Sequence, residues 1–504
     1  MQSLNNSKLM KLLLSLNNHE FKELGLWVNS PIHNSSKRTV SLYDAFKMKF
    51  KNNSPVELPF LLRRVGILQK GKKQKDISPK DIQEFRIVAS KLTIQIEEYL
   101  IWKKNNENTV NNKIALMDQL ATKRLYDMIP PVLNKTSKQL TDNPLRDFRF
   151  IRHKYKLDEM RFYGHLTQKN RLASESLKQV VKSLQNSCLT QLLRYYAALV
   201  NSRNLISGKE EFSLMNNLIN FLENSEEIED FTVKIYFKQL LLLDQGKAKD
   251  YYEFKVLLFH SFDAFDTNEI RQFLGFMSNF CIVMVNRGNL QFQEERLEIY
   301  QTGLSKNCWN TGIYFSHHHF VNIVITGLSI EENNWVESFI ESYQDQLNPA
   351  VQKNTVNLSI AMLQFELKNY SNAHSLLNQV SKSEDFLHHA LMEVLLIKIY
   401  YQSETLTFEN FSIHPIHSRI KSFNAYLKIA SGKKLSPHMK SIYTNFVVII
   451  KQIINIHKKS FSITRLDKKA ISKLDLVIQE LQTNCTTLTP LTERQWLLAQ
   501  IKAL

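Results

Sequence analysis

The stretch TVNLSIAMLQFELKNYSNAHSLLNQV, residues 355–380, predicts two helices joined by a short turn. The small residues Ala361 and Ala373 lie twelve positions apart, one on each predicted helix, and small side chains let two helix backbones approach closely. We expect Tyr370 to pack over the turn and Leu377 to fill the groove between the helices. These four residues are therefore the predicted packing residues of a helical hairpin.

Apolar stripes of helical period run through most of the remaining chain. In residues 80–104 and 171–205, apolar side chains recur at steps of three and four, which is typical of amphipathic helices. The two stripes contain Ile82, Phe85, Val88, Leu92, Ile96 and Tyr99, and Leu177, Val180, Leu184, Cys188, Leu192, Tyr196 and Val200. Only 12 Gly and 11 Pro occur in 504 residues, fewer than a sheet-rich fold needs for its tight turns. The sequence predicts an all-α fold.

Many of the prolines mark predicted helix starts. Most of the 11 prolines directly follow Ser, Thr or Asn, and a capping side chain before Pro is typical of a helix N-terminus. These prolines are Pro31, Pro55, Pro79, Pro144, Pro349, Pro437 and Pro490. The start at Pro79 is the best marked, because Ser78 and Asp81 around it resemble a capping box.

The turns between the stripes are short and polar, which forces neighbouring helices to pack antiparallel. We predict an α-solenoid of stacked antiparallel helical hairpins over residues 136–504. A less regular helical region, residues 1–135, is expected to precede it. The boundary rests on Pro130, Pro131 and the polar run NKTSKQLTDN behind them.

The hairpin of residues 355–380 resembles one tetratricopeptide-type repeat, although further copies at a period of about 34 residues are not legible. A wider resemblance is to an uncharacterised family of long helical bacterial proteins common in Bacteroidetes. It rests on SLNNHEFKELGLWVNSPIHNSSKRTVSLYDAF (15–46), ALMEVLLIKIYYQSETL (390–406), IKSFNAYLKIASGKKLSPHMKSIYTNFVVII (420–450) and ERQWLLAQI (493–501). This resemblance implies a tetratricopeptide-like helical array and no particular activity.

Cysteine usage and hydropathy favour a cytoplasmic protein. The four cysteines, Cys188, Cys281, Cys308 and Cys485, form no close pair, which argues against a disulfide framework or a zinc knuckle. The first apolar patch is interrupted by Lys11 and lacks a small-residue cleavage site, so we expect no signal peptide. No run approaches the roughly 18 apolar residues of a membrane span.

The net charge of +17 is unevenly distributed, with an acidic middle, residues 201–350, between two basic ends. A basic loop surrounds Gly66, and its possible phosphate contacts are Arg63, Arg64, Lys70, Lys72, Lys73 and Lys75. The loop sequence GILQKGKK does not make a nucleotide-binding loop, because Lys73 stands where Ser or Thr would hold magnesium. Solvated basic faces are the simpler interpretation of these charges.

Three adjacent histidines, His317, His318 and His319, lie in the segment YFSHHHF. Consecutive side chains on a helix point about 100° apart, so three adjacent histidines cannot converge on one ion. We give the same interpretation to the pair His388 with His389. His414 and His417 lie three apart across a helix start predicted at Pro415, and without a third ligand we take them as cap and surface residues. We expect packing and hydrogen bonding at these positions, with neither a metal nor a cofactor.

The sequence predicts no catalytic residues, because it contains no Gly-x-Ser-x-Gly, dinucleotide-binding or His-Glu-x-x-His motif. Stacked helical repeats expose long surfaces that suit binding more than catalysis. We expect a non-enzymatic interaction scaffold that holds a protein or peptide partner on a concave face. The alternative is a nucleic-acid-associated protein whose basic terminal regions bind phosphates.

Overall fold

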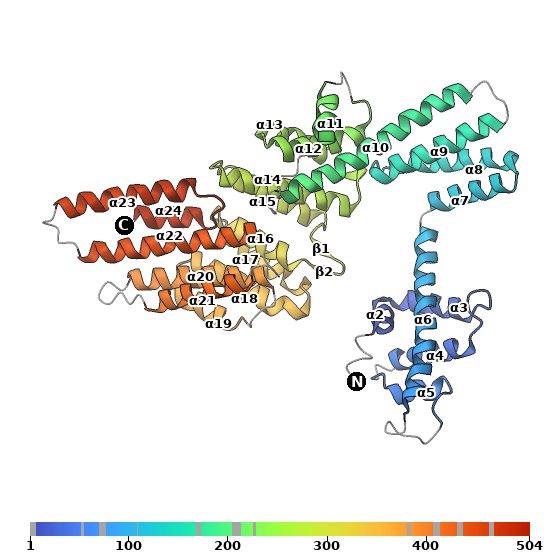
Figure 1. Ribbon diagram of the computed structural model, residues 1–504, viewed down its shortest axis with the longest axis horizontal. Coiled ribbons are helices and arrows are strands. Elements are labelled where there is room, and N and C mark those ends of the chain that lie inside the picture. The colour runs from blue at the N-terminus through green and yellow to red at the C-terminus, as the bar shows by residue number, and fades with distance from the viewer. Residues whose placement is uncertain are drawn as a thin grey trace. The chain divides into compact units, whose positions relative to one another are not determined.

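The computed structural model describes residues 7–51, 55–69, 77–107, 109–167, 173–203, 213–224, 228–380, 385–406, 414–430, 437–462 and 468–504. Over these ranges the protein is all-helical (Figure 1), and its only strands, β1 (Asn310–Thr311) and β2 (Tyr314–Phe315), form a short antiparallel hairpin. The predicted all-α class is therefore confirmed. None of the described helices is both long enough and apolar enough to cross a membrane.

The chain forms two compact units. The first unit contains residues 1–142 and 156–178, and the second unit contains residues 143–155 and 179–504. Two helices, α9 (Phe148–Thr167) and α10 (Ala173–Arg203), therefore contribute residues to both units.

The boundary predicted after residue 135 falls inside helix α8 (Ile129–Asp142). Pro130 and Pro131 lie in its first turn, where a missing N–H loses no intrahelical hydrogen bond. The polar run behind them is helical because one of its faces is buried, through Leu133, Thr136 and Leu140.

The first unit is built around the long helix α6. In chain order its helices are α2 (Lys8–Ser15), α3 (Asn18–Asn29), α4 (Lys37–Lys51), α5 (Leu58–Arg64), α6 (Pro79–Glu107), α7 (Thr109–Thr122), η2 (Tyr126–Met128) and α8, followed by parts of α9 and α10. Helices α2, α3 and α4 pack against α6, and the predicted stripe on α6 is buried from Phe85 to Tyr99. The predicted capping box is also confirmed, because the Asp81 N–H donates to Ser78 Oγ at 3.2 Å and the Ser78 N–H donates to Asp81 Oδ2 at 2.9 Å.

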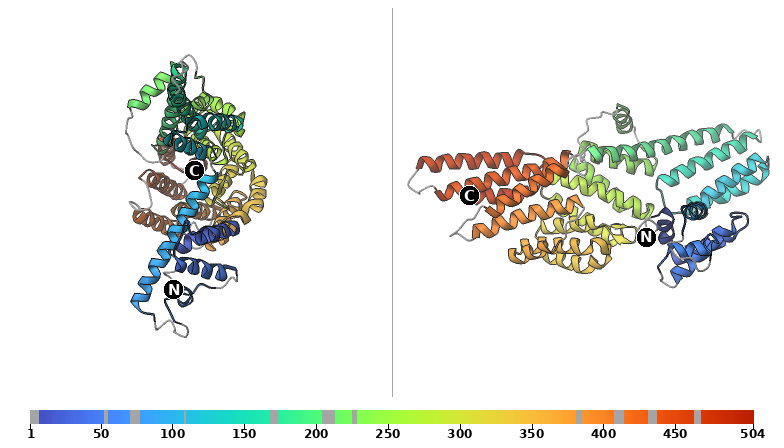
Figure 2. Two further views of the ribbon diagram at one scale, coloured as in Figure 1. Left: turned by 90° about the vertical axis from the view of Figure 1, so that its right-hand side faces the viewer. Right: turned by 60° about the horizontal axis from the view of Figure 1, so that its bottom comes forward.

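The second unit is a succession of packed helices. After α10 these are α11 (Ser213–Glu223), α12 (Phe231–Gln245), α13 (Ala248–Phe259), η3 (Phe262–Ala264), α14 (Thr267–Asn286), α15 (Phe292–Ser305), α16 (His317–Leu328), α17 (Asn333–Tyr343), η4 (Gln344–Gln346), α18 (Pro349–Glu366), α19 (Tyr370–Asn378), α20 (Phe386–Leu406), α21 (His414–Ala430), α22 (Pro437–Ser462), α23 (Lys468–Thr487) and α24 (Arg494–Lys502). Consecutive helices pack as pairs from α12 to α19, and the first helices of neighbouring pairs also touch, as in α12 with α14 and α16 with α18. Helices α20 to α24 lie side by side at the C-terminal end (Figure 2).

The first helix of each of these four pairs ends in the same kind of turn. A residue one to three positions beyond the helix end adopts the left-handed conformation. These residues are Gly246, Gly288, Glu331 and Lys368, with φ of 63°, 96°, 63° and 62°. A left-handed residue commonly ends a helix and redirects the chain. The turns recur about every 40 residues, a longer spacing than the roughly 34 residues of a tetratricopeptide repeat.

Small residues let the paired helices approach each other. Gly327 of α16 faces α17 so closely that an added Cβ would lie 2.5 Å from Val336 Cγ2. Ala361 and Ala373 occupy fully buried positions in the α18–α19 pair. The α16–α17 and α18–α19 pairs are therefore fixed by local packing between their two helices.

Candidate functional site

The four predicted packing residues lie within the α18–α19 pair. Ala361, Ala373 and Leu377 are buried, and Tyr370 is half-buried with its ring 5.4 Å from the ring of Phe365. Their contacts stabilise the hairpin. A functional site therefore has to be sought at other positions.

The basic loop is described only at its beginning. Arg63 and Arg64 end helix α5, and both are exposed. The guanidinium carbon of Arg64 lies 5.5 Å from the centre of the Phe60 ring. The other predicted phosphate contacts, Lys70, Lys72, Lys73 and Lys75, lie outside the described residues. Phosphate binding by this loop stays a prediction.

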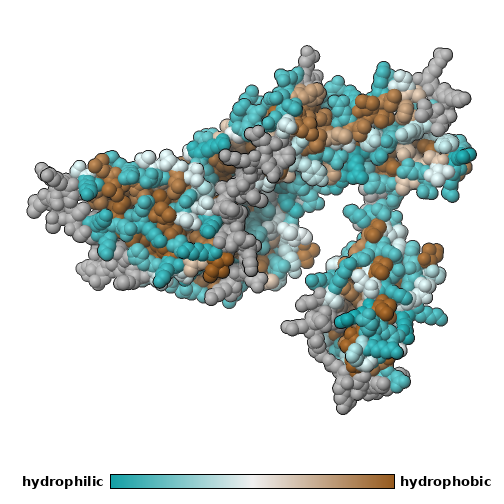
Figure 3. Space-filling model, in the orientation of Figure 1, coloured by the Kyte–Doolittle hydropathy of each residue, from teal (hydrophilic) through white to brown (hydrophobic). Residues whose placement is uncertain are grey.

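Helix α10 carries a row of apolar side chains on its exposed face. Val181, Leu184, Leu192 and Tyr195 are 57%, 40%, 38% and 70% exposed, and Cys188 among them is also exposed. At 100° per residue these five side chains fall within an arc of about 80°. We call them the α10 stripe. Hydrophobic surface is visible over α10 in Figure 3.

The opposite face of α10 is buried and is lined by small polar side chains. Ser183, Ser187 and Thr190 are buried there, together with Leu193 and Ala197. The Ser183 hydroxyl donates to the backbone oxygen of Gln179 at 2.9 Å, so part of this polar face is satisfied within the helix itself. The polarity of α10 is therefore reversed over these turns.

The apolar row predicted for residues 171–205 is consequently only partly buried. Leu177, Leu184, Cys188 and Leu192 are exposed, whereas Val200 is buried. Within this row, only Val200 at the C-terminal end is buried in the core. Steps of four residues rotate the row by about 40° each, so it winds from the exposed face of the helix to the buried one.

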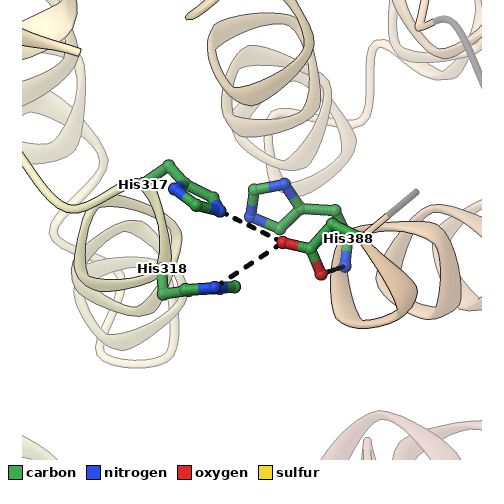
Figure 4. A group of neighbouring side chains, drawn as sticks. His317, His318 and His388 are labelled. Carbon is green, nitrogen blue, oxygen red and sulfur yellow. Dashed lines mark hydrogen bonds and ion pairs between the residues drawn. The ribbon is translucent and has the colours of Figure 1, made fainter. Parts of the chain in front are cut away.

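A second candidate lies where the first turns of α16 and α20 meet (Figure 4). His317 and His318 open α16, Asp385 directly precedes α20, and His388 lies in the first turn of α20. One donor atom from each of these four side chains lies within 4.8 Å of the other three. We call these residues the histidine cluster.

Asp385 connects the two helices of the cluster. Its Oδ1 accepts hydrogen bonds from the backbone N–H groups of Leu387 at 2.9 Å and His388 at 3.4 Å, which caps α20. Its Oδ2 lies 3.1 Å from Nε2 of His317 and 3.6 Å from Nε2 of His318.

His388 completes the cluster from the side of α20. Its ring centre lies 5.1 Å and 5.7 Å from the ring centres of His317 and His318. The side chain is only 6% exposed, and its Nε2 has no hydrogen-bond partner within the described part of the chain. Figure 4 shows this ring directed towards the two imidazoles of α16.

Burial decides the protonation of the cluster. It lowers the pKa of His388 to about 4, against the opposing effect of the Asp385 carboxylate, and it also lowers the pKa of His318. Burial alone would raise the pKa of Asp385, but the neighbouring imidazoles and its backbone hydrogen bonds outweigh burial and lower that pKa. At neutral pH, His318 and His388 are therefore neutral while Asp385 is ionised, which is the state in which these groups bind transition metals.

The remaining histidines of the predicted groups lie elsewhere. His319 stacks on Trp309 with 4.6 Å between ring centres, so two of the three adjacent histidines converge and the third does not. His389 lies 3.6 Å from Glu393, and His417 is exposed. The side chain of His414 lies outside the described residues.

Sequence reasoning missed the cluster because its two halves are 68 residues apart. The rule that separates adjacent side chains by 100° applies within one helix, and it ignores ligands from a second helix. One local signal was present, since Asp385 and His388 have the i, i+3 spacing that places two side chains on one face of a helix start.

Comparison of the chain with protein-family models, with curated proteins and with solved structures gave no match in any of the three. The resemblance to a bacterial helical family and to tetratricopeptide repeats therefore stays a prediction. Function therefore has to be argued from the α10 stripe and the histidine cluster.

Proposed function

We propose that this protein is a non-enzymatic scaffold that holds a protein partner, and that the partner docks on the α10 stripe. Four helical pairs with the same kind of turn support a tetratricopeptide-like α-solenoid as its architecture. Such arrays present long surfaces because each repeat contacts only its neighbours.

The reversed polarity of α10 is the observation that carries this proposal. A surface helix normally buries its apolar side, but here Ser183, Ser187 and Thr190 are inside while the stripe is outside. Single exposed apolar residues are common and need no explanation. A contiguous row of them is typical of an interaction surface.

The spacing of the stripe fits an amphipathic helix of the partner. From Val181 to Tyr195 the stripe extends about 21 Å along the helix axis, which is close to four turns. Its residues follow each other at steps of three and four, the spacing at which side chains of two helices interlock. We expect the partner to contribute a helix of similar length with apolar residues at the same steps.

The exposed thiol of Cys188 allows a direct test. The other three cysteines, Cys281, Cys308 and Cys485, are buried, so a thiol-reactive photo-crosslinker labels the centre of the stripe selectively. We expect the labelled protein to crosslink to one dominant protein in an extract of its source cells. Substitution of Leu184→Gln together with Leu192→Gln should abolish that crosslink.

The matched control carries the same label on an isolated exposed residue. Ile313, in the turn of the β-hairpin, is 86% exposed, and Cys188→Ser combined with Ile313→Cys moves the label there. Equal crosslinking from both positions, or an unchanged product in the double leucine variant, would refute the docking surface. A crosslink to a second copy of the same chain would replace the scaffold by a self-assembling protein.

A further inference from the structure

The donor set of the histidine cluster is that of a transition-metal site. Three imidazole nitrogens and one carboxylate oxygen lie within 4.8 Å of one another. In a tetrahedral zinc site, bond lengths of about 2.0–2.1 Å place neighbouring donor atoms about 3.3 Å apart. The separations of 3.1 Å and 3.6 Å from Asp385 to His317 and His318 bracket that value. The wider separations close by small side-chain rotations, for which His318, with a 48% exposed side chain, has room.

The unpaired nitrogen of His388 distinguishes a metal site from a network of hydrogen bonds. A network of imidazoles around Asp385 accounts for His317 and His318, but it leaves the buried Nε2 of His388 without a partner. A buried polar atom without a hydrogen bond is costly and calls for an explanation. A ligand that accepts electron pairs from several imidazoles at once supplies the missing interaction.

We infer that His317, His318, Asp385 and His388 bind a divalent first-row transition cation, with Zn²⁺ as the best fit, and that the ion joins α16 to α20. Imidazole is a preferred ligand of Zn²⁺, Cu²⁺ and Ni²⁺, whereas Mg²⁺ and Ca²⁺ require mainly oxygen donors. This inference is independent of the α10 stripe.

Four protein ligands assign the ion a structural role. Catalytic zinc sites keep one position open for water, whereas structural sites fill all four positions with side chains. Helices α16 and α20 both pack against α18, and helices α17, η4, α18 and α19 lie between them along the chain. The ion therefore links two helices of the succession that do not follow each other directly.

Two charges at the site act in opposite directions. The N-termini of both helices carry partial positive charge, which opposes a cation. Asp385 counters this effect because its Oδ1 accepts the N–H groups of α20 while its Oδ2 remains directed at the histidines. We expect Asp385→Asn to weaken binding while the cap of α20 is retained.

The test is a zinc titration of the full-length protein without a histidine tag. We expect one Zn²⁺ per chain by calorimetry and, with Co²⁺ as a spectroscopic substitute, the intense visible absorption of tetrahedral coordination. His318→Gln should lower the affinity at least 10-fold. This substitution leaves folding intact because His318 is about half exposed. A chelator should lower the melting temperature of the natural protein and leave that of His318→Gln unchanged, since an ion bound only by the folded state stabilises it.

His417→Gln is the matched control because it removes an exposed histidine outside the cluster. It should bind Zn²⁺ as tightly as the natural protein. Equal affinity of the natural protein, His318→Gln and Asp385→Asn would overturn the inference, as would the absence of stoichiometric binding. An octahedral Co²⁺ spectrum would also overturn it, because that geometry shows an ion held by fewer than the four side chains.

Discussion

Helices α10 and α20 are both long and both carry apolar rows, yet they use those rows in opposite ways. Every residue of α20 from Met392 to Ile399 is buried, including Glu393 and Lys398. One side of α20 contributes to the core with α10–α19, and the other side to the core with α21–α24. On α10, the side directed inward is largely polar and the α10 stripe faces outward.

The difference shows what determines whether an apolar row becomes core. A helix with neighbours on two sides buries apolar residues all round, and it therefore lacks a marked amphipathic pattern. A helix with a neighbour on one side only can expose its other apolar row. The row becomes core only if the fold places a neighbour against it.

The largest expected effect is a cavity in α20. Ile397 is fully buried in the core shared with α21 and α22, so Ile397→Ala should lower the free energy of unfolding by about 2–5 kcal/mol. Ile429→Ala is the matched control, because Ile429 in the neighbouring α21 is 81% exposed, and it should change stability by about 0.5 kcal/mol or less. Urea unfolding followed by circular dichroism measures both. Similar losses in the two variants would contradict the central position of α20.

The pH dependence of stability tests the polar side of α10. Arg194 of α10 lies 3.2 Å from Glu269 of α14, which also accepts a hydrogen bond from Tyr236. Burial, with the nearby carboxylates of Asp147 and Asp266, raises the pKa of Glu269 above 4.5 despite the opposing effects of Tyr236 and Arg194. The folded protein therefore holds this proton more tightly than the unfolded chain does.

The sign of the effect follows from linkage. The contribution of Glu269 to stability is fully present below about pH 4.5 and is lost as the pH rises through its raised pKa. Glu269→Gln keeps an acceptor for Tyr236 and cannot ionise. We expect the variant to gain stability relative to the natural protein as the pH rises from about 4.5 to about 8, measured as urea midpoints. Parallel midpoint curves would show that Glu269 does not titrate differently on folding.

Sequence pattern predicted the helices well because caps and apolar period are local. Pro79, Pro349 and Pro437 begin helices as expected. Pro31, Pro55, Pro144 and Pro490 do not begin helices, since α4, α5, α9 and α24 start three to six residues later. A capping side chain before Pro fits a turn as well as a helix start, so the pattern does not separate the two.

The repeat and the histidine cluster could not be predicted in the same way. The recurring turn is set by backbone conformation, and Gly, Glu and Lys all occupy its left-handed position, so no single residue type marks it. The cluster depends on the packing of α16 and α20 against α18, a contact that no local pattern specifies. The reversed face of α10 was missed because the predicted row winds around the helix.

A smaller effect is expected from a single hydroxyl on the buried face of α10. Thr190 is fully buried, and its Oγ1 has no hydrogen-bond partner among the described residues. Replacing an unpaired buried hydroxyl by a methyl group of the same shape removes its desolvation cost, so Thr190→Val should raise the free energy of unfolding by about 1 kcal/mol. Ser183→Ala is the control, because the Ser183 hydroxyl is already paired, and it should give no gain. A loss of stability in Thr190→Val would indicate that the hydroxyl is needed.

The smallest expected effect is that of Leu192→Ala in the α10 stripe, and its neighbour Leu193 provides the comparison. Leu192 is 38% exposed in the stripe, and Leu193 beside it is fully buried. Leu193→Ala should therefore cost about 2–5 kcal/mol, whereas Leu192→Ala should cost about 0.5 kcal/mol or less. Because the two substitutions remove the same atoms from the same helix, differences in helix propensity cancel. If Leu192→Ala destabilises the isolated protein as much as Leu193→Ala does, a neighbour within the chain covers the stripe, and no outside partner is required to explain it.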